Sequence, residues 1–228
     1  MAAGTRLLLA FLLTSSCASP ASKLEGEDDT LFAGIRVEHA VGNQEKKVTG
    51  AIVLDVFVGS GEFDQFVPAG ESVALDDSIF QGPLTVELDY ELSFLSAAYR
   101  LRLETAERSW LEGRVGLGVN ELDATLRGVG EDDSDKLLGV GPFLGAAFVF
   151  GPADFFELFL GYDFTVAVDS QERTIGQFQL GARVDLTDRV GLLVAYRDLK
   201  YEAERDTSFR SDLDLGLSGA VVMLVFTP

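Results

Sequence analysis

Residues 84–94 read LTVELDYELSF, and apolar and polar residues alternate through the whole stretch. Successive side chains of a β-strand point to opposite faces, so this segment predicts a strand with one apolar face and one polar face. The polar face carries Glu87, Asp89 and Glu91. Similar alternation recurs as far as the C-terminus, and helical spacing of apolar residues is nearly absent after residue 25. The sequence therefore predicts an all-β protein.

Length and charge narrow the class of protein. The chain has 228 residues and a formal net charge of −19 at pH 7. This charge argues against binding to nucleic acid, because the phosphate backbone is itself negative. After the N-terminus no apolar run reaches the roughly 18–20 residues that a membrane-spanning helix requires. If the protein crosses a membrane, we expect it to do so with strands.

The N-terminus has the pattern of an export signal. Arg6 precedes the apolar run LLLAFLL at residues 7–13, which has the length of a secretory signal core. The only cysteine, Cys17, follows in a context that resembles the lipobox of bacterial lipoproteins, in which the cysteine is acylated. Ordinary signal cleavage after Ala18 is the alternative. We expect a signal peptide over 1–18, a flexible acidic tether over 19–30 and one β-barrel domain over 31–228.

Turn signals divide the β-domain into about ten candidate strands. Their expected ranges are 30–41, 48–59, 84–94, 98–105, 110–127, 137–151, 154–168, 174–186, 189–202 and 211–226. The number falls to about eight if 84–105 is one bulged strand or if 30–41 does not join the sheet. We expect a long acidic loop over 60–83.

Short and long connections alternate along the chain. The short ones are 151–153 and 187–189, and the longer polar ones are 128–136, 169–173 and 203–210. This order is typical of membrane barrels, in which tight periplasmic turns alternate with longer outer loops. The sequence therefore predicts an antiparallel, up-and-down transmembrane β-barrel of about 8–10 strands, apolar outside and polar within.

Charged residues occupy the polar faces, close to the centres of the expected strands. In a barrel of this size they would face a narrow lumen, where an unpaired charge is costly, so we expect a network of ion pairs. The expected members are Glu87, Asp89, Glu91, Arg100, Arg102, Glu112, Arg114, Glu157, Asp163, Arg183, Asp185 and Arg197. We expect Arg100, Arg102 and Arg114 to neutralise acidic residues of neighbouring strands.

The export signal, the single β-domain and the terminal segment LDLGLSGAVVMLVF at residues 213–226 resemble the small outer-membrane barrel proteins of the OmpA, OmpX and OmpW type. The resemblance implies a monomer in the outer membrane of a Gram-negative bacterium. It also implies contact with outer-membrane lipid and lipopolysaccharide, and assembly by the barrel-assembly machinery. Members often end in an aromatic residue, whereas here Phe226 is followed by Thr227 and Pro228.

The sequence gives no sign of catalysis. The only histidine, His39, shares a strand face with Ile35 and Val37, and the G-x-S-x-G, H-E-x-x-H and C-x-x-C motifs do not occur. We expect no enzymatic activity, no metal and no cofactor. The expected role is structural or surface-interacting, with the lumen filled by ion pairs. A narrow passive pore for small solutes and a soluble, lipocalin-like lipid-binding barrel are the alternatives.

Overall fold

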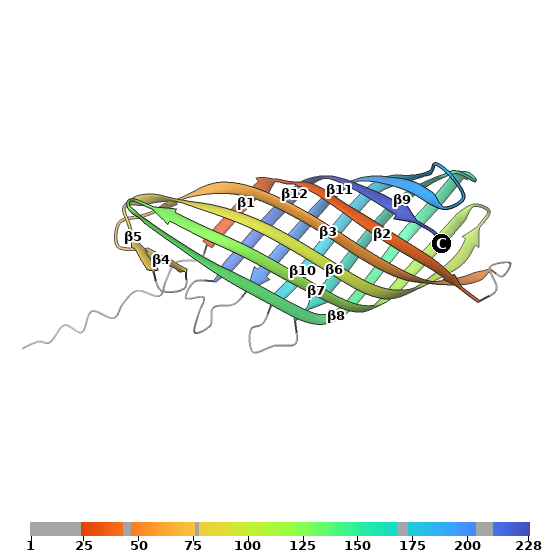
Figure 1. Ribbon diagram of the computed structural model, residues 1–228, viewed down its shortest axis with the longest axis horizontal. Helices are drawn as coiled ribbons and strands as arrows, with labels where there is room; N and C mark the ends of the chain where they lie inside the picture. The colour runs from red at the N-terminus through yellow and green to blue at the C-terminus, as the bar shows by residue number, and fades with distance from the viewer. Residues whose placement is uncertain (1–23, 43–46, 76–77, 168–172, 204–211) are drawn as a thin grey trace, which may run out of the picture.

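The structure is a computed structural model that describes residues 24–42, 47–75, 78–167, 173–203 and 212–228. The expected signal peptide and Cys17 lie outside these residues. One large sheet dominates the fold (Figure 1). In the part of the chain that the structure describes, no helix is long and apolar enough to cross a membrane.

The large sheet has ten strands. They are β1 (Leu24–Asp29), β2 (Leu31–Val41), β3 (Val48–Val67), β6 (Leu84–Ala106), β7 (Ser109–Gly128), β8 (Glu131–Ala153), β9 (Phe156–Val166), β10 (Arg173–Asp185), β11 (Val190–Ala203) and β12 (Leu213–Phe226). A separate hairpin of β4 (Ser72–Leu75) and β5 (Ser78–Gln81) lies at one end of the sheet (Figure 1).

Hydrogen bonds between strands run around the sheet as a ring, which makes the fold barrel-like. Within the large sheet, β3 pairs antiparallel with β6, and from β6 to β12 each strand pairs antiparallel with the next one. This is the up-and-down order that the sequence predicts. The ring closes where β12 pairs with β1 and β2, and here the pairing is parallel. Both pairings keep one register, from Leu24 opposite Leu213 to Val37 opposite Phe226. β1 and β2 therefore act as one strand interrupted at Thr30.

Three stretches that we expected to be loop or tether are strands. Residues 24–29, expected within the tether, form β1. β3 continues to Val67, so much of the expected loop at 60–83 is strand. β7 and β8 extend until only Val129 and Gly130 remain between them, and Gly130 has a φ of 80° that glycine adopts without strain. All three stretches are rich in polar residues, which favoured the loop interpretation.

β6 is a single strand whose apolar face changes sides halfway along. Its even-numbered residues point inward from Val86 to Arg102, and its odd-numbered residues point outward. Up to Phe94 the inward residues are apolar and the outward ones polar; from Leu95 onward this is reversed. The stretch 84–94 therefore turns its apolar face to the interior, and the expectation that this face lies outside is wrong.

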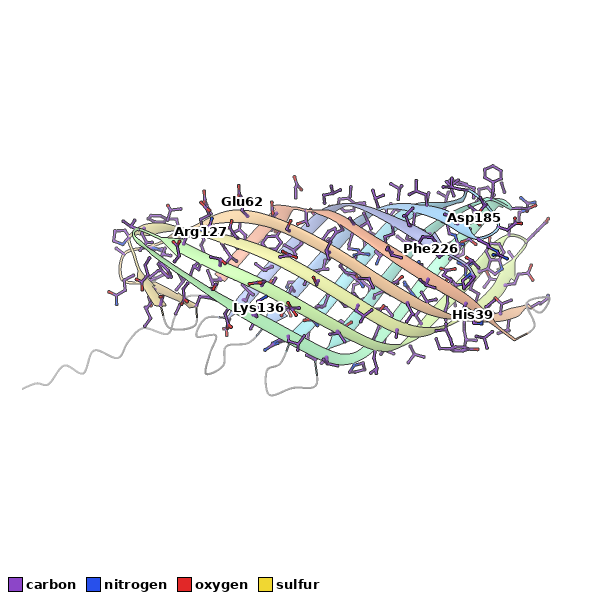
Figure 2. All side chains as sticks on the ribbon, viewed as in Figure 1. His39, Glu62, Arg127, Lys136, Asp185 and Phe226 are labelled. Atoms are coloured by element: carbon purple, nitrogen blue, oxygen red, sulfur yellow. The ribbon has the colours of Figure 1, made fainter. Side chains whose placement is uncertain are left out.

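The same reversal occurs on the neighbouring strands at one common level. Towards the end of the ring that carries β4 and β5, the outward residues are polar and include Ser60 on β3, Glu121 on β7, Asp198 on β11 and Ser218 on β12. Towards the opposite end they are apolar and include Val58, Val119, Tyr196 and Ala220. The level at which the change occurs is called the border. These positions are near neighbours in the pairing register. The border divides the ring into two halves. The half with β4 and β5 is called the acidic half, and the half with His39, Asp185 and Phe226 the belted half (Figure 2).

A layer of aromatic rings marks the border inside the ring. Phe57 stacks on Phe94 with 4.9 Å between the ring centroids, Phe32 meets Phe57 edge-on at 5.9 Å, and Phe143 lies 6.3 Å from Phe94. All four rings are buried. The interior of the acidic half beyond this layer is mainly apolar, whereas the interior of the belted half carries most of the buried charges.

Candidate functional site

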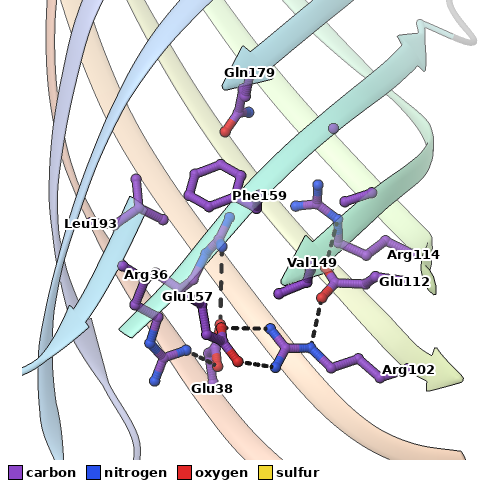
Figure 3. A pocket seen from close by; sticks show the side chains of 13 residues that line it. Arg36, Glu38, Arg102, Glu112, Arg114, Val149, Glu157, Phe159, Gln179 and Leu193 are labelled. Carbon is purple, nitrogen blue, oxygen red and sulfur yellow. Dashed lines mark hydrogen bonds and ion pairs between the residues drawn. The ribbon is translucent and has the colours of Figure 1, made fainter. Parts of the chain in front are cut away.

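The most distinctive chemistry of the structure is an ion-pair network inside the belted half (Figure 3). Glu38 on β2 lies at its centre. Arg100 Nη1 donates to Glu38 Oε1 at 2.8 Å, and Arg183 Nη1 donates to Glu38 Oε2 at 2.7 Å. Both carboxylate oxygens of Glu38 are thus paired, and this side chain joins β6 to β10.

A second chain of pairs crosses from β7 to β9 through Arg102. Its Nε donates to Glu112 at 2.9 Å, while Nη1 and Nη2 donate to the two oxygens of Glu157 at 2.8 and 3.1 Å. A forked contact of this kind is the strongest geometry for an arginine and a carboxylate. The sequence predicted that these three residues share a face, and the structure brings them together.

The network continues towards the border. Arg36 makes a forked contact with Asp55, at 2.6 and 2.8 Å. Arg114 lies 2.8 Å from Asp163 Oδ1 and 3.4 Å from Glu112. At the opposite end, Arg183 donates to Asp185 at 2.8 Å. Among the described residues, the interior of the belted half and its border hold six arginines and six carboxylates: Arg36, Arg100, Arg102, Arg114, Arg183 and Arg197, and Glu38, Asp55, Glu112, Glu157, Asp163 and Asp185.

Arg197 is the exception among the interior arginines. It is 1% exposed, and its guanidinium carbon lies 3.7 Å from the centroid of Phe57 and 5.3 Å from that of Phe32. Within the described residues it makes no ion pair, and its Nε and Nη1 have no hydrogen-bond partner. Arg197 is therefore held by aromatic rings at the border rather than by a carboxylate.

Three expected members of the network lie elsewhere. Glu87, Asp89 and Glu91 are on the outer wall of the acidic half, because the odd-numbered side chains of β6 all point outward. Arg127 on β7 pairs with Glu87 at 3.0 Å and with Asp89 at 2.5 Å. The expectation that Arg100, Arg102 and Arg114 neutralise acidic residues of neighbouring strands is therefore wrong for these three carboxylates, whereas Glu112 does pair with Arg102 and Arg114.

Sequence reasoning missed three residues that the network depends on. Arg36, Glu38 and Asp55 fill the interior face of β2 and β3. The signal was present: Arg36 and Glu38 alternate with apolar residues in IRVEHAV, and Asp55 lies between Leu54 and Val56. His39 points outward and is exposed, so it takes no part in the network.

The network leaves little free space. The cavity among its side chains has a volume of about 20 Å³ and is lined by residues that include Arg36, Glu38, Arg102, Glu112 and Arg114 (Figure 3). A volume of roughly 10–15 Å³ is the minimum for one water molecule, so the cavity admits about one. The network acts as a plug across the belted half.

The acidic half has the opposite arrangement. Its interior is built mainly from apolar side chains of the surrounding strands, although Arg173 is also buried there and donates to the carbonyl of Leu138. The β4–β5 hairpin covers its end with Val73, Leu75 and Phe80. Ser78 fixes this hairpin to β8: its amide donates to Asp133 at 2.8 Å and its hydroxyl to Glu131 at 2.9 Å. An apolar interior closed in this way resembles the core of a soluble β-protein.

One buried polar contact in the acidic half joins the ring closure to β6. The Tyr90 hydroxyl lies 2.6 Å from Thr30 Oγ1 and donates to Asp28 Oδ2 at 2.7 Å. Burial raises the pKa of Tyr90, and the hydrogen bond with Asp28 raises it further. The phenol is thereby kept in its neutral, hydrogen-bonding form.

The outer wall of the acidic half also holds three carboxylates close together. One oxygen each of Glu62, Glu87 and Asp89 lies within 4.8 Å of the others. Arg127 already neutralises two of them, so surface ion pairing accounts for the cluster.

No family model matches the chain, and neither a curated protein nor a solved structure is significantly similar to it.

Proposed function

We propose that this chain is a monomeric outer-membrane β-barrel whose belted half crosses the bilayer and whose acidic half projects into water. Its role in this proposal is structural or surface-interacting. The observation that carries the proposal is the border, where outward side chains change from polar to apolar at one level on neighbouring strands. Monomeric soluble proteins rarely expose an apolar patch larger than a few hundred Å².

The outward apolar residues of the belted half are called the belt. The length of the belt along the strands supports a bilayer as its surroundings. On β6 the outward apolar residues run from Leu95 to Leu103, and on β7 from Leu111 to Val119. A tilted strand needs about 9–11 residues to cross the hydrocarbon core. Each stretch meets this requirement, and the pairing between β6 and β7 places them side by side.

The turns support an orientation with the belted end towards the periplasm. At this end short turns join Ala106 to Ser109, Ala153 to Phe156, and Asp185 to Val190. The other end carries the long connection that contains the β4–β5 hairpin, together with the two-residue turn between β7 and β8. Short periplasmic turns and longer outer segments are the rule for such barrels. In this orientation the rim of the belt next to the acidic half contacts lipopolysaccharide.

The filled interior favours a structural role over solute passage. The ion pairs close the belted half, and the aromatic layer and the apolar residues close the acidic half. A pore would require a continuous polar path. Against the runner-up, a narrow passive pore, the cavity among the side chains of the network has a volume of only about 20 Å³.

Two measurements test this function. The purified protein, refolded into vesicles, should float with them on a density gradient after a urea wash and show heat-modifiable gel migration. In planar bilayers it should conduct little, and Arg102→Ala should raise the conductance by loosening the plug. Protein that is washed off the vesicles would refute membrane insertion, and steady conductance of the unaltered protein would refute the closed interior.

A further inference from the structure

The ring is not closed by backbone hydrogen bonds along its whole length. Antiparallel pairing of β2 with β3 ends at Leu31 opposite Ser60. Beyond this point β1 lies beside residues 61–67 of β3, but among the described residues no backbone pairing joins them. β1 and residues 61–67 each have one paired edge, with β12 and β6 respectively. The unpaired boundary between them, within the acidic half, is called the seam.

Charge explains why the seam stays unpaired. If the register of β2 and β3 continued, Asp29 would lie opposite Glu62, and Glu27 opposite Asp64. Like charges directly opposite each other destabilise a pair of strands. In the described part of the chain none of these four carboxylates forms a salt bridge with a cation. Both sides of the seam therefore present unneutralised acids to solvent.

In the described residues, the contacts that join the two sides of the seam involve side chains. The Phe63 ring occupies the place that a Cβ of Gly26 would take, and a Cβ at Gly61 would meet the carboxylate of Asp28. The amide of Glu25 donates to Gln65 Oε1 at 3.2 Å. Opening the seam thus breaks these contacts but no strand-to-strand backbone ladder. A strand edge with free amides and carbonyls is a template for another strand.

The surroundings of the seam extend the negative surface. An open groove of about 490 Å³ runs beside β1 and is lined by Glu25, Glu27, Asp198 and Asp214, with Lys200 as the single cation. Lys200 is already paired with Glu202 at 2.6 Å and with Asp214 at 3.6 Å. Glu27 and Asp198 on this groove form no salt bridge within the described residues, so cationic side chains placed over the seam would meet unpaired carboxylates.

We propose that the seam binds an extended peptide segment in which basic and apolar residues alternate. The segment inserts as a strand between β1 and residues 61–67 of β3, where it displaces the contact of Phe63 with Gly26 and that of Glu25 with Gln65. Its basic side chains point outward to Glu27, Asp29, Glu62 and Asp64, and its apolar side chains point inward beside Phe63. Main-chain hydrogen bonds supply affinity, and the alternation supplies specificity. This inference specifies a partner for the surface-interaction role, but it does not require membrane insertion.

The test uses the full chain in detergent, where a failure of membrane insertion has no effect. The probe is a fluorescent peptide of about eight residues with alternating lysine and valine, the length of an ordinary strand. A disulfide lock is introduced as Asp28→Cys with Gly61→Cys, together with Cys17→Ser. Fluorescence anisotropy should show binding to the reduced form, a loss of affinity of about tenfold or more on oxidation, and recovery on reduction.

Two controls separate strand addition from simple charge attraction. A disulfide at Thr174→Cys with Glu202→Cys joins paired strands of the same half, and it should leave the affinity unchanged. A peptide with alternate backbone nitrogens methylated keeps its charge but cannot pair as a strand, and it should bind the unlocked protein about tenfold more weakly. Equal affinity for the locked and unlocked forms, or equal binding of the methylated peptide, would overturn the proposal, as would the absence of binding.

Discussion

Phe94 and Leu95 are neighbours on β6 and point to opposite sides of the ring. Phe94 is 2% exposed and packs in the interior aromatic layer, whereas Leu95 is 44% exposed on the outer wall. A regular strand brings two adjacent apolar residues to opposite faces without any bulge. This pair therefore marks the point at which the apolar face of β6 changes from inside to outside.

A charge placed on the belt should lower the free energy of unfolding far more than a charge placed on the outer wall of the acidic half. Leu160 on β9 is 45% exposed within the belt, opposite Leu180 and Phe148. In a bilayer, Leu160→Arg should lower stability by about 2–4 kcal/mol if it lies near the midplane. Glu91→Arg, outward in the acidic half, should change it by about 0.5 kcal/mol or less. Urea unfolding in vesicles measures both, and equal effects would count against a membrane-embedded belt.

The contact between Arg102 and Glu157 should contribute strongly to stability because both groups are largely buried. Arg102→Ala leaves Glu157 without its forked partner and should cost about 3–5 kcal/mol. The double variant Arg102→Met with Glu157→Met removes both charges and should recover most of the loss. A double-mutant cycle from urea midpoints measures the coupling, and additive losses would show that the two residues do not act as a pair.

The buried hydrogen bonds of Tyr90 should make the stability of the protein depend on pH in the alkaline range. Tyr90→Phe removes the hydrogen bonds with Thr30 and Asp28 and should cost about 1–3 kcal/mol at neutral pH. Because burial raises the pKa of Tyr90 in the folded state, the tyrosine contributes its full stability below the unfolded pKa of about 10 and loses it as the pH rises further.

Urea midpoints of the unaltered protein and of Tyr90→Phe, compared from pH 7 to 11, provide the check. The difference between them should be constant up to about pH 9 and shrink above about pH 10. A difference that does not change over this range would show that Tyr90 titrates alike in the folded and unfolded states.

Cys17 is predicted from the sequence to carry a lipid, and it lies outside the residues that the structure describes. A labelled fatty acid should be incorporated into the unaltered protein but not into Cys17→Ser. Mass spectrometry of the mature protein provides the second measurement. A mature chain that begins at Ser19 would establish ordinary cleavage after Ala18 and rule out lipidation.

Much of the strand pattern could be predicted from the sequence, but the facing of the strands could not. Alternation in 84–94 indicates a strand, yet a period of two does not tell which face is inside. The change of phase at Phe94 and Leu95 makes the sequence predict 84–94 and 98–105 as separate strands, with one bulged strand over 84–105 as the alternative; the structure has one strand. Glu87, Asp89 and Glu91 were assigned to the lumen for this reason.

The network was predicted in part, because its members come from strands far apart in the chain. Arg102, Glu112 and Glu157 were expected together, and the structure pairs them. Glu38 was missed because its partners lie on strands that do not pair with β2. Arg100 on β6 lies across β3, and only the ring closure brings β2 near Arg183 on β10. The parallel pairing of β1 and β2 with β12 has no local sequence signal.

The border is the feature that most directly supports a membrane-embedded belted half. A spin-label scan of one strand across the border tests whether that half lies in lipid. Nitroxides placed singly at the outward positions of β6, from Thr85 to Leu103 in a Cys17→Ser background, report exposure to oxygen in lipid and to a nickel chelate in water. In vesicles the labels from Thr85 to Ser93 should be accessible to nickel, and those from Leu95 to Leu103 to oxygen, with the change between Ser93 and Leu95. Access of nickel to every position from Leu95 to Leu103 would show that the belt lies in water, and would contradict the membrane barrel.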